Sequence, residues 1–128
     1  MKSPKNNFYL VISANNGVEA NLLVDLMGQT HHNKDFFAHI LHLSTKTIDR
    51  YIKDGKKFNP SESEKILKIS QLYEQGIELF GDVNAFNRWL EKPAYGLGEQ
   101  IPTDLMLTIS GIDLIKNELT NIEYGNLA

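Results

Sequence analysis

Apolar residues recur every three or four positions along most of the chain, which is the spacing of one face of an α-helix. The pattern predicts a nearly all-α protein of about seven helices. The predicted helices cover residues 18–29, 34–43, 44–55, 59–81, 82–91, 102–109 and 111–124.

Several predicted helices begin at residues that favour helix N-termini. Ser44, Asn59 and Asp82 each stand where an N-cap side chain is expected. Ser110, followed by Asp113 three residues later, resembles a capping box for the last helix.

The first 17 residues do not follow the helical pattern. We treat them as an N-terminal arm, a short strand or a disordered segment. "FYLVIS" at 8–13 is a possible short strand, and a buried coil fits nearly as well. The remainder divides into two predicted domains, residues 18–81 and residues 82–128.

The only tryptophan lies just before an irregular segment bounded by Pro93 and Pro102. A large aromatic residue at helical spacing is usually a packing residue. We therefore predict that Trp89 anchors the second domain. The predicted core of that domain consists of Phe86, Trp89, Leu90 and Ile115.

The composition, 41% hydrophobic and 23% charged over 128 residues, is that of a soluble globular protein. The absence of cysteine excludes disulfides and thiolate metal sites. The apolar run "FYLVI" is too short for a membrane span or a signal-peptide core. We expect a cytoplasmic protein.

Charge is unevenly distributed along the chain. Residues 34–68 contain eight basic and five acidic residues, a net charge of +3. Residues 74–123 contain three basic and nine acidic residues, a net charge of −6. The asymmetry suggests two surfaces with different partners, although ordinary surface scatter also produces such differences.

The segment "FFAHILHLSTKTIDRYIKDG", from Phe36 to Gly55, has the pattern of a helix-turn-helix. Its second helix begins with hydroxyl and basic side chains, which can meet phosphates and base edges. The alternative is a helical hairpin with a solvated face. The candidate DNA-binding residues are Ser44, Thr45, Lys46, Thr47, Arg50, Lys53 and Lys56.

The sequence gives little support for metal binding, dinucleotide binding or catalysis. His31, His32, His39 and His42 cluster, but no carboxylate completes a metal-ligand set, so we predict no metal site. "GLGEQ" at 96–100 lacks the third glycine and the preceding strand of a dinucleotide-binding fingerprint. We predict no catalytic residues, no cofactor and no enzyme activity.

Residues 79–125 resemble the C-terminal toxin-binding domain of the Xre/MbcA/ParS antitoxins. The matching elements are "LFGD" at 79–82, Trp89-Leu90, Pro93, Leu97-Gly98, "P-x-x-L" at 102–105, Gly111 and "L-x-x-I-x-x-G" at 119–125. Upstream, the segment from Leu43 to Ser63 is similar to the family's Xre-like helix-turn-helix. Two features depart from the pattern: Asn121 replaces a frequent basic residue, and residues 1–17 have no counterpart.

The resemblance implies the antitoxin of a type II toxin-antitoxin system. Its partner would be a RES-domain toxin that consumes NAD or transfers a group from it. The C-terminal domain would cover the toxin's active site, and the helix-turn-helix would bind operator DNA. The assembly would be a homodimer or a toxin-antitoxin hetero-oligomer.

An acidic C-terminal surface could engage the basic groups of a cleft that binds a dinucleotide. The tail "EYGNLA" at 123–128 is the predicted plug. The candidate toxin-binding residues are Tyr95, Leu97, Glu118, Asn121, Glu123 and Tyr124.

Two alternatives remain open. The chain could be a stand-alone helix-turn-helix transcription regulator whose C-terminal domain only dimerises. It could also bind a toxin without binding DNA, because Asp49 and Asp54 lie among the basic residues of the second helix.

Overall fold

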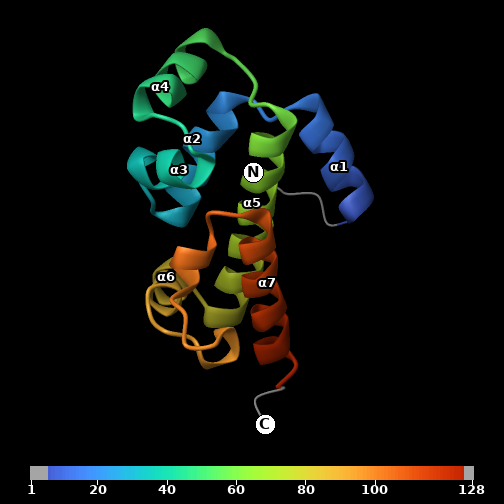
Figure 1. Cartoon of the computed structure of the whole chain (residues 1–128), viewed down its shortest axis with the longest axis vertical. Coiled ribbons are helices and arrows are strands. Elements are labelled where there is room, and N and C mark those ends of the chain that lie inside the picture. The colour runs from blue at the N-terminus through green and yellow to red at the C-terminus, as the bar shows by residue number, and fades with distance from the viewer. Residues whose placement is uncertain (1–5, 126–128) are drawn as a thin grey trace. The chain divides into compact units, whose positions relative to one another are not determined.

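The computed structural model describes residues 6–125, which contain seven α-helices, two 3-10 helices and no strand (Figure 1). The prediction of an all-α fold is confirmed. The elements are α1 (Asn7–Asn16), α2 (Ala20–Thr30), α3 (Lys34–Leu41), α4 (Thr45–Asp54), α5 (Pro60–Phe80), α6 (Val83–Leu90), η1 (Tyr95–Leu97), η2 (Pro102–Leu105) and α7 (Ile109–Glu123).

The chain divides into two compact units between Gln71 and Leu72, a point that lies inside α5. The boundary predicted from the sequence lay later, at 81/82, where α5 ends. Hereafter, unit 1 ends at Gln71 and unit 2 begins at Leu72. No helix among residues 6–125 has the length and hydropathy that a membrane crossing would require.

Unit 1 packs α1 to α4 and the first half of α5 around one apolar core. The connection between α4 and α5 is tied to the start of α2 by main-chain hydrogen bonds. Phe58 N donates to Val18 O at 2.8 Å, and Ala20 N donates to Lys56 O at 3.0 Å. The fully buried residues of this core include Leu23, Leu26, Phe37, Ile48, Ile66 and Ile69.

Ser63 is a buried polar residue that joins separate parts of unit 1. Its hydroxyl accepts a hydrogen bond from Val18 N at 2.8 Å and donates to Phe58 O at 3.2 Å. Because both groups are buried, each would lose a partner if the hydroxyl were removed. This serine belongs to the segment that resembles the Xre-like helix-turn-helix, and its role here is structural.

The short strand considered for residues 8–13 is wrong, because the segment lies in α1. Asn6 caps this helix by accepting a hydrogen bond from Tyr9 N at 3.0 Å. Leu10 and Ala14, four residues apart, are the buried residues of α1. The β-branched and aromatic composition favoured a strand, but burial at helical spacing prevailed.

Unit 2 is built around Phe86 of α6, which is fully buried. The ring of Phe86 contacts those of Tyr73, Phe80 and Trp89, at centroid distances of 5.0, 5.8 and 6.2 Å. A Cβ at Gly76 would collide with the Phe86 ring, so α5 approaches α6 closely at a residue without a side chain.

The expectation that Trp89 anchors this core needs correction. Phe86, Leu90 and Ile115 are fully buried, whereas Trp89 is only partly buried. Its indole lies beside Phe80 and Phe86, at the edge of the cluster. Its position on α6 explains this, because Phe86 and Leu90 are four residues apart on the inner face and Trp89 flanks them.

α7 begins differently from the sequence prediction. Thr108, not Ser110, is its N-cap, and the Thr108 hydroxyl accepts a hydrogen bond from Gly111 N at 3.0 Å. A Cβ at Gly111 would overlap Leu105 O, so this first turn must carry a glycine. α7 then runs beside the second half of α5, where Gln75 Nε2 donates to Thr120 Oγ1 at 3.0 Å (Figure 1).

Candidate functional site

The first candidate surface lies on α3 and α4, the helix pair that the sequence predicted to be a helix-turn-helix. The turn between them is closed by His42, which adopts a left-handed conformation with φ 56°, and by Leu43 N, which donates to Ala38 O at 3.0 Å. Ile48 is fully buried and fixes α4 in unit 1. The turn and the buried residue together fix which side of α4 faces solvent.

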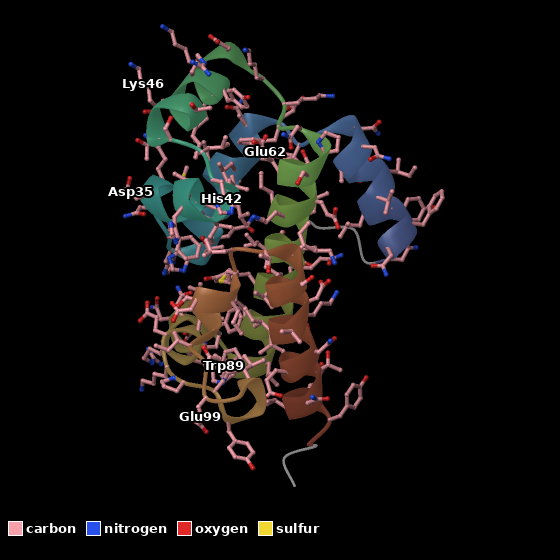
Figure 2. The ribbon with its side chains drawn as sticks, in the orientation of Figure 1. Asp35, His42, Lys46, Glu62, Trp89 and Glu99 are labelled. Carbon is pink, nitrogen blue, oxygen red and sulfur yellow. The ribbon has the colours of Figure 1, made fainter. Side chains whose placement is uncertain are left out.

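Three basic residues lie on the exposed side of α4, which also carries Asp49 and Asp54. Lys46, Arg50 and Lys53 are all exposed, and Lys46 projects away from α2 and α3 (Figure 2). These three residues lie at spacings of three and four, so they share one helix face. The structure thus brings together three of the four charged members of the predicted DNA-binding set.

The hydroxyl residues of that set have a local role. Ser44 Oγ accepts a hydrogen bond from Thr47 N at 3.0 Å and donates to Thr47 Oγ1 at 2.9 Å. Ser44 is therefore the N-cap of α4, as predicted. Thr45 and Thr47 are half-buried, so less of each is available to a partner than of the basic residues.

Two neighbouring contacts modify the charge of this surface. Asp49 forms an ion pair with Lys34 at the start of α3, which partly offsets the acidic charge among the basic residues of α4.

Lys56 Nζ lies 5.6 Å from the centre of the Tyr51 ring, a cation–π arrangement. Lys56 remains exposed beside the C-terminus of α4.

Lys65, a buried lysine of α5, forms a hydrogen bond with the same helix pair. Lys65 Nζ donates to Ile40 O at 2.8 Å, near the C-terminal end of α3, where helix carbonyls lack intrahelical partners. Burial lowers the pKa of Lys65 from its ordinary value of 10.5. Lys65 therefore belongs to the scaffold and not to the exposed basic surface.

The second candidate surface is the loop between α6 and η2 in unit 2, which closes on itself. Ala94 N donates to Gln100 O at 3.0 Å, and Leu97 N and Glu99 N both donate to Ala94 O at 3.0 Å. Gly98 and Glu99 both adopt positive φ, which permits the tight return. Although irregular in sequence, the loop is a defined hydrogen-bonded structure.

The side chain of Glu118 packs against this loop at Gly96. It is buried on α7, and a Cβ at Gly96 would overlap its carboxylate. Glu118, which the sequence predicted as a toxin contact, is thus buried, and a side chain at Gly96 would require the Glu118 carboxylate to shift. Only the spatial meeting of α7 and η1 reveals this, since the two residues are far apart in sequence.

The other predicted toxin-binding residues are distributed over η1 and the end of α7. Tyr95 is 87% exposed and Tyr124 is 75% exposed, while Leu97 is half-buried. Asn121 and Glu123 are exposed on the last turns of α7. The last three residues of the predicted plug, 126–128, lie outside the described part of the chain.

The four histidines do not form a metal site. Among residues 6–125, no group of three or more His, Cys, Asp or Glu side chains is arranged to hold a metal ion. His32 instead stacks on Phe36 at a centroid distance of 3.7 Å. His31 and His42 both adopt positive φ at helix ends, so their placement reflects turn formation.

The part of the chain that forms the second surface also matches a known domain family. Residues 75–125 match the model described as the antitoxin Xre/MbcA/ParS C-terminal toxin-binding domain. The match begins near the start of unit 2 and ends at the last described residue, so it includes the η1 loop and all of α7.

Three curated proteins are similar over a longer part of the chain. Antitoxin Xre of Photorhabdus laumondii is 24% identical over 112 residues, covering 87% of this chain and 76% of that protein. The Prs ADP-ribosylating antitoxin of a Sphingobium species is 26% identical over 121 residues, covering 88% and 76%. Antitoxin Xre of Yersinia enterocolitica is 31% identical over 84 residues, covering 65% and 57%.

Proposed function

Because this chain belongs to the Xre/MbcA/ParS family of antitoxins, we propose that unit 2 neutralises a RES-domain toxin and that α4 of unit 1 binds operator DNA. Neutralisation would occur by covering the toxin's active site, without catalysis by the antitoxin. The complex would be a homodimer or a toxin-antitoxin hetero-oligomer.

The family match over residues 75–125 is the observation that carries the toxin-binding part. The structure adds a candidate contact surface, consisting of the η1 loop and the end of α7. Tyr95 and Tyr124 are large and exposed aromatic residues, the type that most often anchors protein interfaces. Because hydrogen bonds within the η1 loop hold it in one conformation, Tyr95 would lose little conformational entropy on binding.

Charge supports the same assignment. A RES-type toxin that binds NAD needs basic groups for the pyrophosphate, and residues 74–123 carry a net charge of −6. Opposite potentials accelerate association. Glu123 is the exposed acid next to Tyr124 at the end of α7 and would be the nearest to such a cleft.

The first test measures affinity for the toxin and rescue of growth on co-expression. Tyr95→Ala should weaken binding at least about tenfold, as expected for an interface anchor. Leu114→Ala is the matched control, because Leu114 is an apolar residue of unit 2 that is 54% exposed and outside the proposed surface. If Tyr95→Ala and Leu114→Ala bind the toxin with equal affinity, Tyr95 is not an interface residue.

A truncation tests the tail separately. It should begin after Glu123, because Leu119 is fully buried and Thr120 accepts a hydrogen bond from Gln75. Removing residues 124–128 should abolish rescue while the melting temperature stays close to that of the full chain. Full rescue by the shortened protein would contradict the plug.

The role of Glu118 can be examined by combining two substitutions. Gly96→Ala should weaken toxin binding, because the new methyl group displaces either η1 or the Glu118 carboxylate. Glu118→Ala would relieve that collision, so the double variant should bind better than Gly96→Ala alone. Additive losses would show that the two positions are not coupled.

DNA binding rests on the basic face of α4. Lys46→Ala and Arg50→Ala should each reduce operator affinity, and affinity should fall steeply as salt rises. Lys92→Ala, an exposed lysine in unit 2, is the control. If all three variants bind like the unmodified chain, the DNA-binding face lies elsewhere or DNA binding has been lost while toxin binding remains.

The second candidate function is a stand-alone transcription regulator, which the α3–α4 geometry favours independently of unit 2. It predicts operator binding that needs no toxin and no growth rescue by co-expression. Rescue that depends on Tyr95 would exclude it.

A further inference from the structure

Asp49 is an acidic residue on the exposed side of α4, the side proposed to bind DNA. It lies three residues after Lys46, four before Lys53 and next to Arg50, so it borders the same helix face as these basic residues. A carboxylate at this place repels DNA phosphates and lowers the affinity for every DNA sequence alike. Such a residue is still favourable to recognition if it selects one sequence over others.

The ion pair between Asp49 and Lys34 contributes little to holding α4 against α3. The two side chains are 56% and 37% exposed, and exposed ion pairs add little to stability. Ile48 of α4 and Phe37 of α3 are both fully buried, and the burial of such apolar side chains is what fixes the helix pair. Stability therefore does not explain why a carboxylate stands among the basic residues.

The ion pair leaves the Asp49 carboxylate able to accept a further hydrogen bond. Lys34 Nζ contacts Oδ1, one of its two oxygens. An ionised carboxylate has about four acceptor positions, so a single ammonium contact leaves most of them available. The side chain is 56% exposed, which makes them accessible to a partner. Lys34 also restricts the carboxylate to the side of α4 next to α3, so less conformational entropy is lost on binding.

We propose that Asp49 recognises a cytosine in the major groove of the operator, and that Lys34 is the positioning residue that holds its carboxylate. The amino group of cytosine is a donor at the major-groove edge, and aspartate is an acceptor that pairs with it. Arg50, the next residue, can bind O6 and N7 of guanine. This role rests on the DNA binding proposed for α4, and it adds which base the helix selects.

Selection of bound duplexes from a random pool, followed by sequencing, tests the contact. The unmodified chain should select cytosine at one position at least about fivefold over the other bases, as one good base contact allows. Asp49→Asn should change that preference to adenine, because an amide side chain pairs with N6 and N7 of adenine. Asp49→Ala should lose the preference and bind unselected duplex more tightly, because it carries one negative charge fewer.

Asp54→Asn is the matched control, because Asp54 is an exposed acid at the end of the same helix. The two aspartates are five residues apart, which places them about 140° from each other around α4. Asp54→Asn removes the same charge, so its affinity for unselected duplex should rise in a similar way. Its base preference should stay that of the unmodified chain, and circular dichroism should show the same helix content for all variants.

Substitutions of Lys34 test its positioning role. Lys34→Met should weaken the cytosine preference as well as the affinity, because the carboxylate is no longer held in one place. Lys34→Arg should restore both, since it keeps the positive charge beside Asp49. A residue that only adds a positive charge near DNA would change the affinity for all sequences and leave the base preference as it is.

A cytosine preference that survives both Asp49 substitutions overturns the proposal, and so does an unmodified chain that binds duplex without selecting cytosine. A shift to adenine in Asp54→Asn also overturns it, because charge alone would then explain the effect. In each case, salt-dependent binding that Lys46→Ala weakens would leave the DNA-binding function of α4 standing. An unmodified chain that binds no duplex would remove both that function and the role of Asp49, while neutralisation by unit 2 would be unaffected.

Discussion

At the scale of single residues, burial distinguishes aromatic side chains that look equivalent in the sequence. Phe86 and Trp89 both lie on α6, but only Phe86 is fully buried, with three aromatic neighbours and Gly76 against its ring. The free energy of packing should follow this difference, because the cost of truncation depends on how completely a side chain is enclosed.

Phe86→Ala should therefore destabilise the protein by about 3–5 kcal/mol, and Trp89→Ala by clearly less. Urea denaturation followed by circular dichroism gives both free energies of unfolding. A larger loss for Trp89→Ala would mean that the tryptophan anchors unit 2, as its uniqueness in the sequence suggested.

Tyr73 links stability to pH. Burial, assisted by the Glu91 carboxylate, raises the pKa of Tyr73 above its ordinary value of 10.0, and its hydroxyl donates to Asn87 Oδ1 at 2.6 Å. Above about pH 10 the unfolded chain loses this phenol proton while the folded chain keeps it. The contribution of Tyr73 to stability is therefore complete below that pH and falls as pH rises, by up to about 1.4 kcal/mol per unit.

Tyr73→Phe should reduce the decline in unfolding free energy between about pH 9 and pH 11. Lys65 acts in the opposite direction, because its lowered pKa leaves the unfolded chain with more protons below 10.5. Both proteins contain Lys65, so the difference between their pH profiles isolates Tyr73. Parallel profiles would show that Tyr73 ionises equally in both states.

At the scale of elements, helix starts depend on side chains that cap the free N–H groups of the first turn. Ser44 caps α4 and Asp82 caps α6, and Asn59 and Glu62 form a reciprocal capping box at the start of α5. Each of these pairs lies within three residues, so local sequence was enough to predict it. The N-cap of α7 was predicted wrongly, because two candidate residues, Thr108 and Ser110, lie close together.

Thr108→Ala should cost about 1 kcal/mol of stability, the usual value of an N-cap, whereas Ser110→Ala should be nearly neutral. Thermal melts of the two variants measure the difference. The reverse order would place the start of α7 at Ser110, as the sequence pattern alone indicated.

At the scale of the whole molecule, charge separates the two proposed activities. Residues 34–68 carry +3 and residues 74–123 carry −6, which suits DNA in one case and a basic cleft in the other. Glu123→Lys should lower the association rate with a toxin several-fold at low salt and much less at high salt, because screening removes steering. The same variant should leave operator binding unchanged, which stopped-flow and fluorescence titrations measure.

The sequence by itself determined the helices from α2 to α7, the N-caps of α4, α5 and α6, and the family of the C-terminal half. These features depend on residues a few positions apart, and a single chain displays them directly. The basic face of α4 was predictable for the same reason, since helical spacing alone places Lys46, Arg50 and Lys53 together.

Tertiary structure decided which of these residues remain at the surface. The burial of Glu118 beneath Gly96, the central place of Phe86, and the helix at residues 7–16 each depend on contacts between segments remote in sequence. The physical reason is that exclusion from solvent is a property of packed neighbours. No local pattern specifies which neighbours a side chain will have.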